Sequence, residues 1–327
     1  MSFKKELLKK SALSLCLGAM VAFSLVGCGD TTKETTGEVA EETATEEQKW
    51  NVVATTTMLS DLTRIIGGEH VEVIGLMGPG VDPHLYQATA NDTDQMATAD
   101  MVVYNGLHLE GQMVEFLEES LPERGVFVTC IENGLDESEL LGWTGGSTYD
   151  PHFWFDVTMW MDAAKETAKG FSEFDPDNKA DYEANLEAYI EELEELDVYI
   201  KEKVDGISKE DRVLVTSHDA FQYFSVAYGF QVEAVQGIST EAEASTDAVS
   251  SLAGDIYDNG WKAIFTESSV SPKTIEAVQE AVEAQGGHVE IGGELYSDSY
   301  GDEASGDDSY IKMCTKNIDI IYNALTK

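Results

Sequence analysis

Basic residues are scarce in this sequence. Lysine and arginine total 20 against 62 aspartates and glutamates, which gives a formal net charge of −42 at pH 7. A protein that binds nucleic acid needs the opposite sign, because it gains affinity by displacing cations from phosphates. The composition therefore argues against nucleic-acid binding and against adsorption to an anionic membrane surface, and it favours the gathering of cations around the molecule.

Cysteine is also scarce, with four residues in 327. Cys16 lies inside an apolar N-terminal segment and Cys28 at its end, whereas Cys130 and Cys314 lie in apolar-patterned segments of the body. The last two are typical of small buried hydrophobic residues. So few cysteines exclude a disulfide framework and a cysteine metal cluster.

The long apolar run of this sequence is N-terminal. Residues 1–28 combine a basic start, MSFKKELLKK, with SALSLCLGAMVAFSLVG, which has the length of a signal-peptide core and is short for a spanning helix. The run ends in LVGC, which resembles the lipobox of bacterial lipoproteins. That resemblance implies lipidation of Cys28 and a mature chain anchored to the cell membrane on its extracytoplasmic side, at the cell surface or in the periplasm. A signal anchor with an incidental cysteine is the alternative.

Residues 29–49 are rich in threonine and glutamate and have almost no large apolar residue. Such a segment cannot bury enough surface to offset its chain entropy. It therefore predicts an acidic, disordered tether between the anchor and the body.

From Trp50 onward, short β-branched runs alternate with helical patterns. This alternation predicts an α/β fold, and the length of 327 residues favours two lobes. We expect an N-terminal lobe over 50–175 and a C-terminal lobe over 206–327, each with a mainly parallel four-stranded sheet flanked by helices. The predicted strands are WNVVATT, VEVIGLM, MVVYNG and VFVTC in the first lobe, and VLVTS, VEAVQG, AIFTE and HVEIGGEL in the second.

Residues 176–205 predict one long helix that joins the two lobes. Asp175 and Pro176 suit its first positions, Gly206 suits its end, and apolar residues recur every three or four positions between them. Such a helix is roughly 45 Å long at 1.5 Å per residue. A coiled coil with a partner helix is the competing interpretation of the apolar stripe.

The tripeptide DPH occurs twice, with His84 and His152. Proline fixes its own φ and restricts the residue before it, so both histidines leave stiff loops. His84 and His152 follow strands of the first lobe, His218 directly follows VLVTS, and Asp298 directly follows HVEIGGEL. Ligands of open parallel sheets bind beyond the carboxyl ends of the strands. Each residue alone could be structural, but three imidazoles and one carboxylate together form a tetrahedral shell for a divalent cation such as Zn²⁺.

Seven segments together carry a family resemblance. In chain order they are GVDPHLYQAT, NGLHLEGQM, DPHFWFDVTMW, TSHDAFQYFSVAYGF, QGISTEAEAS, FTESSV and GGELYSDSYGD. Over residues 50–327 the chain resembles the TroA-type zinc/manganese receptors, the metal-binding lipoproteins of ABC importers. The resemblance implies two α/β lobes joined by a backbone helix, metal ligands His84, His152, His218 and Asp298, and delivery of the ion to an ABC transporter permease.

The resemblance also bears on the choice of ion. Family members tuned to manganese often carry glutamate at the position of His218, and many zinc members have a histidine-rich acidic loop in the first lobe. This sequence has neither feature. We therefore expect Zn²⁺ first and Mn²⁺ second.

Other residues are candidates for supporting the ligands. Glu267 ends the predicted strand AIFTE and could accept a proton from a ligand imidazole. Asp82 and Asp150, each before a proline, are weaker candidates. His108, in NGLHLE, is expected to be structural or to support the ligands from outside the coordination sphere.

We expect no enzymatic activity, because four protein ligands leave no coordination position for a catalytic water and no G-x-S-x-G nucleophile motif is present. A secreted zinc metallo-hydrolase and a surface adhesin are the alternatives. The expected molecule is a monomer that closes on its ion by a small tilt or by local loop ordering, not by a wide hinge motion. Its affinity should fall as pH drops through the histidine range near about 6.5.

Overall fold

The computed structural model describes residues 49–143 and 149–327. The signal peptide, Cys28 and all of the predicted tether except Lys49 therefore lie outside the described residues, and the predictions for them stay predictions. No described helix is long and apolar enough to cross a membrane.

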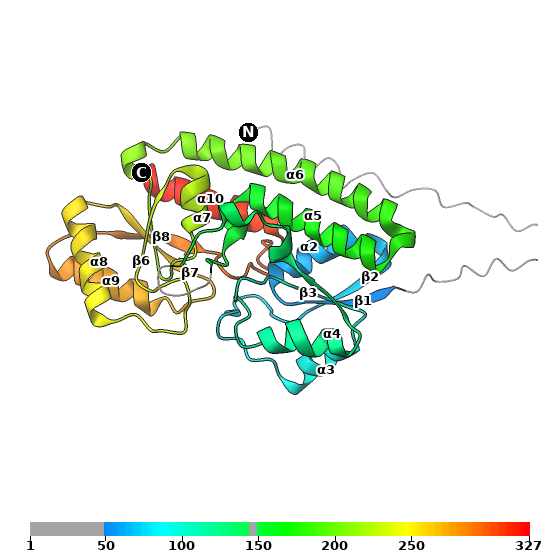
Figure 1. Cartoon of the computed structure of the whole chain (residues 1–327). Coiled ribbons are helices and arrows are strands. Elements are labelled where there is room, and N and C mark those ends of the chain that lie inside the picture. Colours follow the sequence, from blue (N-terminus) through cyan, green and yellow to red (C-terminus); the bar gives the residue numbers. More distant parts are fainter. Residues whose placement is uncertain (1–48, 144–148) are drawn as a thin grey trace, which may run out of the picture. The chain divides into compact units, whose positions relative to one another are not determined.

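The first half of the described chain contains a four-stranded parallel sheet in the order β2-β1-β3-β4. Its strands are β1 (Trp50–Ala54), β2 (Val71–Gly75), β3 (Met101–Tyr104) and β4 (Phe127–Cys130). Alternate residues of the central strands face opposite sides, so Val52 packs in the core that contains α2 (Thr57–Gly67), and Val53 packs in a second core with α3 (Ala90–Thr98) and α4 (Leu121–Glu123). Helices thus cover both faces of this sheet (Figure 1).

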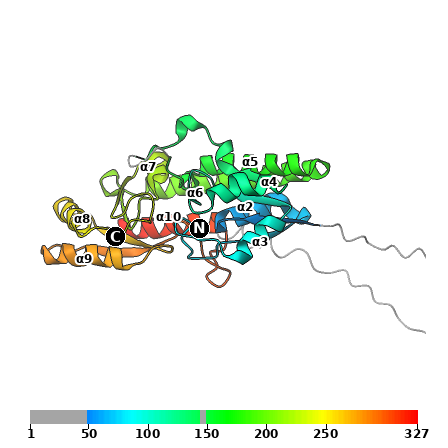
Figure 2. The same ribbon diagram turned by 60° about the horizontal axis from the view of Figure 1, so that its bottom comes forward.

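The second half contains two parallel strand pairs. They are β5 (Val213–Thr216) with β6 (Gln231–Ala234), and β7 (Ala263–Glu267) with β8 (Glu290–Leu295). All four predicted strands are present, but they form two two-stranded sheets rather than the predicted four-stranded one: β5 lies beside β7, and among the described residues no ladder of hydrogen bonds joins them. The helices of this half are α7 (Gln222–Tyr228), α8 (Thr246–Asn259), α9 (Lys273–Ala284) and α10 (Tyr310–Leu325). The helices α8 and α9 lie side by side in both views (Figures 1 and 2).

The long α6 (Lys179–Asp205) joins the halves, and α5 (Val157–Phe174) packs beside it. The 27 residues of α6 follow a 3₁₀ turn at Pro176–Asn178 and end at Gly206. The predicted apolar stripe of α6 is buried against α5, α2 and α10 of the same chain (Figure 1). Helices of the same chain therefore cover the apolar face of α6, and this face is not free to form a coiled coil with a partner helix.

One local prediction was wrong in detail. Asp175 does not cap the long helix: its Oδ2 accepts hydrogen bonds from Trp50 Nε1 at 2.9 Å, Asn178 Nδ2 at 2.8 Å and the Tyr182 hydroxyl at 2.8 Å. The contact with Trp50, which is far away along the chain, thus overrides the local capping preference.

Candidate metal centre

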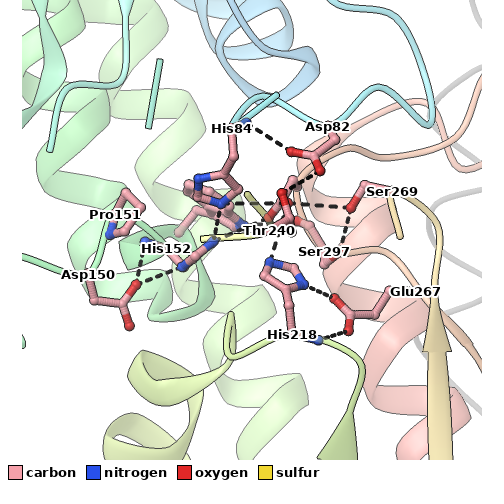
Figure 3. A network of polar contacts seen from close by, with 12 residues as sticks. Asp82, His84, Asp150, Pro151, His152, His218, Thr240, Glu267, Ser269 and Ser297 are labelled. Carbon is pink, nitrogen blue, oxygen red and sulfur yellow. Dashed lines mark hydrogen bonds and ion pairs between the residues drawn. The ribbon is translucent and has the colours of Figure 1, made fainter. Parts of the chain in front are cut away.

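The four residues predicted as ligands meet in the structure. One ligand atom from each of His84, His152, His218 and Asp298 lies within 4.8 Å of the other three, and all four side chains are buried (Figure 3). His84 lies in the loop after β2, His152 in the loop before α5, His218 directly after β5, and Asp298 directly after β8. Each half of the described chain thus contributes two side chains, and all four meet at one point.

The Nε2 atoms of the three imidazoles converge on the Asp298 carboxylate. His152 Nε2 lies 3.4 Å from Oδ1, His218 Nε2 lies 3.3 Å from Oδ2, and His84 Nε2 lies 3.9 Å from Oδ2. His84 Nε2 is also 3.2 Å from His152 Nε2. Among the described residues, His218 Nε2 and Asp298 Oδ1 are buried without a hydrogen-bond partner. Because unpaired buried polar atoms are costly, this donor set fits a bound cation.

Carboxylates hold the opposite nitrogen of two of these imidazoles. His152 Nδ1 lies 2.7 Å from Asp150 Oδ1, and His218 Nδ1 lies 2.6 Å from Glu267 Oε2 (Figure 3). The other oxygen of Glu267 accepts the backbone N–H groups of Ser217 at 2.7 Å and His218 at 2.9 Å. A carboxylate on Nδ1 fixes the ring and leaves Nε2 for an ion. Asp150 and Glu267 thus lie against Nδ1 of His152 and His218 respectively.

A family comparison agrees with this geometry. The model of the family described as ZnuA, zinc-uptake complex component A, periplasmic, matches residues 52–324. The chain belongs to the ZnuA family. The predicted resemblance to TroA-type receptors and the α/β fold class with a long helix are thereby confirmed.

Individual relatives cover most of the chain. The zinc-binding protein TroA of Treponema pallidum is 42% identical over 276 residues, covering 84% of this chain and 89% of TroA. The manganese-binding lipoprotein MntA of Bacillus subtilis is 39% identical over 303 residues, covering 93% of this chain and 95% of MntA. Among solved structures, the periplasmic zinc-binding protein TroA from Treponema pallidum matches with a TM-score of 0.82 and 41% identity, covering 86% of this chain and 100% of that one.

The protonation of this ZnuA-family site differs from ordinary histidine behaviour. Burial lowers the pKa of His84 to about 3, although Asp298 opposes the shift. Burial also acts to lower the pKa of His152, but Asp150 and Asp298 outweigh it and raise that pKa to about 9. In the same way, Glu267 and Asp298 outweigh burial and raise the pKa of His218 well above its usual value. In the metal-free site the His152 imidazole therefore holds a proton at neutral pH, and an ion that binds there must displace it.

Three polar residues around the site were not found by sequence reasoning. The Ser269 hydroxyl lies 3.4 Å from Asp298 Oδ2 and 2.9 Å from the Ser297 hydroxyl. The Thr240 hydroxyl donates to Asp82 Oδ2 at 2.6 Å (Figure 3). All three lie in segments that follow a strand, but short hydroxyl side chains are too common there to single out these positions.

His108 is placed apart from the four ligands. Its side chain is exposed and lines a pocket together with His84, Gln112 and Glu241, whereas the four ligand side chains are buried. Its φ of 67° follows a φ of 51° at Leu107, an uncommon conformation for residues other than glycine. Of the four residues that converge, His84 is the one that lines this pocket.

Proposed function

We propose that this ZnuA-family protein captures one divalent transition metal ion, Zn²⁺ first and Mn²⁺ second, and delivers it to the permease of an ABC transporter. The convergence of His84, His152, His218 and Asp298 carries this proposal. Three imidazole nitrogens and a carboxylate suit a borderline divalent cation. One relative is described as zinc-binding and another as manganese-binding, which supports the same two ions.

The proposed role of the carboxylates is to orient the imidazoles. Glu267 and Asp150 would hold His218 and His152 with Nε2 facing the ion, and the ion would replace the protons that these rings carry. Because each half of the chain supplies two ligands, a bound ion favours the arrangement in which the halves are closed. The continuous packing of α6 against α5, α2 and α10 supports a small tilt rather than a wide hinge motion.

The place of the protein in the cell is part of the proposal. Family members are substrate-binding transport proteins, described as periplasmic or, for relatives such as MntA, as lipoproteins. We infer an extracytoplasmic monomer held at the membrane by lipid on Cys28, without enzymatic activity. A secreted metallo-hydrolase has no support here, since the converging side chains already offer four ligands to one ion. An adhesin role would leave those four side chains unexplained.

Metal analysis and calorimetry test the binding function. The purified, metal-stripped chain should bind one Zn²⁺, and Mn²⁺ should compete for the same site. His152→Ala should lower the affinity for Zn²⁺ about 100-fold or more, because it removes one of the four ligand atoms that converge on the ion. His288→Ala is the matched control, since His288 is exposed at the start of β8 and should leave the affinity unchanged. Substoichiometric binding by the unaltered chain, or equal affinity in H152A, would refute the proposal.

A fractionation experiment tests the anchor. The full chain should sediment with membranes in the producing bacterium, and Cys28→Ser should abolish incorporation of labelled fatty acid. If C28S still incorporates the label at the unaltered level, the anchor is not at Cys28.

A further inference from the structure

Thr240 connects the second half of the chain to the loop that carries His84. It lies between β6 and α8, is 8% exposed, and is followed by the exposed residues 241–243. Its Oγ1 donates to Asp82 Oδ2 at 2.6 Å, and the other oxygen of Asp82 accepts the backbone N–H of His84 at 2.9 Å (Figure 3). One carboxylate therefore joins the backbone of a metal-ligand residue to a hydroxyl group 158 positions away along the chain.

His84 is held by different contacts from the other two histidines. His152 and His218 each have a carboxylate against Nδ1, whereas among the described residues no carboxylate contacts Nδ1 of His84. The residue after His84, Leu85, is 51% exposed, so packing on that side does little to hold the backbone. The orientation of His84 therefore rests largely on Asp82, and the orientation of Asp82 rests on Thr240.

The surroundings of Thr240 show what this contact controls. Its neighbours Ile238, Ser239 and Glu241 line the same pocket as His84, and Gln112 Nε2 donates to Glu241 Oε1 at 3.1 Å across that pocket. Ile238, Ser239 and Glu241 thus share with His84 the pocket next to the metal centre. Loss of the hydrogen bond between Thr240 and Asp82 would let the His84 side chain move. His84 lies next to the pocket, through which an ion can leave.

We propose that Thr240 is a positioning residue for metal retention. It acts through Asp82 to hold His84 in place, and it thereby sets the rate at which the bound ion dissociates. This inference rests on the proposed metal-binding function of the same site. The hydroxyl is bonded to a carboxylate, so its loss removes a charge-assisted hydrogen bond, which is stronger than a neutral one.

Stopped-flow release of Zn²⁺ into an excess of chelator tests the proposal. Thr240→Val keeps the shape and removes the hydroxyl, and it should speed dissociation about tenfold. Thr240→Ser keeps the hydroxyl and should release Zn²⁺ within about twofold of the unaltered protein. Thr167→Val is the control: Thr167 is fully buried in α5, its hydroxyl donates to the Ala163 carbonyl at 2.9 Å, and its loss should not change the rate.

A double variant separates positioning from a general structural defect. Asp82→Ala should speed release by itself, and adding Thr240→Val to Asp82→Ala should speed it no further, because the intermediary is already gone. Thermal unfolding of each metal-free variant checks that the fold is retained. Release from T240V within twofold of the unaltered rate, or a full tenfold effect of T240V in the D82A background, overturns the inference. Failure of the unaltered chain to bind Zn²⁺ would instead refute the proposed function itself.

Discussion

At the scale of single residues, the side chains of the metal centre also bind protons, and an ion must displace these protons. The carboxylates of Asp150, Glu267 and Asp298 raise the pKa of His152 to about 9 and raise that of His218 well above its usual value, against the effect of burial. The Asp298 pKa is held well below its usual value by His218 and His152, although burial opposes this shift. In the metal-free site the His152 imidazolium is therefore paired with carboxylates, and Zn²⁺ competes directly with its proton.

The affinity for Zn²⁺ should rise with pH up to about 9. In the folded protein the pKa of His152 is about 9, above its ordinary value of 6.5. The proton on His152 therefore stabilises the metal-free fold fully below pH 6.5. This stabilisation is lost as pH rises through about 9. Binding must release this proton and any proton that the raised pKa of His218 keeps on that ring, so the dissociation constant should fall about tenfold per pH unit for each proton released. Calorimetry between pH 6 and 8, in buffers of different ionisation enthalpy, counts these protons. A constant affinity over that range would contradict the assignment.

Glu267→Gln should weaken Zn²⁺ binding about 10- to 100-fold. The glutamine keeps the shape but removes the negative charge next to His218 Nδ1, which makes the imidazole a weaker ligand and lowers its pKa. Competition with a zinc chelator measures the change, and the proton count on binding at pH 7 should fall. Glu276→Gln, in the first turn of α9, is the control. An affinity within twofold of the unaltered protein would show that Glu267 does not support His218.

At the scale of elements, α6 stabilises both halves through one buried stripe. Its residues Tyr189, Leu193, Leu196 and Ile200 are each at most 2% exposed, and the helix packs on α5, α2 and α10. The net-acidic outer face of the same helix lies in solvent, so its position is determined by packing rather than by helix propensity alone.

Leu193→Ala should lower the free energy of unfolding by about 2–5 kcal/mol, because it leaves a cavity where a fully buried side chain packed. Denaturant unfolding of the metal-free protein measures this loss. Leu186→Ala, on the same stripe but only partly buried, is the matched comparison and should cost less than half as much. The number of Zn²⁺ ions bound per chain should stay the same in both variants. Equal losses for the two leucines would show that α6 is not held by this stripe.

At the scale of the whole molecule, the formal charge of −42 surrounds a site that binds cations. Such a field concentrates divalent ions near the surface, and dissolved salt screens it over a Debye length of about 10 Å at 0.1 M. Dissolved salt screens the interactions inside the buried metal centre much less. The surface field should therefore act on the rate of association more than on dissociation.

The association rate of Mn²⁺ or Zn²⁺ should fall about tenfold between 20 mM and 500 mM KCl, while the dissociation rate changes less than twofold. Stopped-flow fluorescence measures both rates, since Trp154 is buried with its ring 5.2 Å from that of His152. Association that does not vary with salt would mean that the acidic surface plays no part in gathering the ion.

Sequence reasoning succeeded where a chemical signal coincided with a topological one. His218 and Asp298 directly follow predicted strands, and Glu267 ends one, so their meeting at one edge was predictable before the fold was known. It failed where a contact with a residue far away along the chain determined the local structure. Asp175 looks like a helix cap, but its carboxylate is taken by Trp50, 125 positions away.

The sequence by itself determined the α/β class, the long helix and the residues that converge, because strand periodicity, proline-stiffened loops and residue chemistry are local properties. Only the tertiary structure decided which group contacts which nitrogen. Asp150 and Glu267 hold Nδ1 of two histidines, whereas His84 is held through Asp82 and Thr240. Such contacts join segments far apart along the chain, and burial among them sets the pKa of each group. Neither the distances nor the burial can be read from the order of residues.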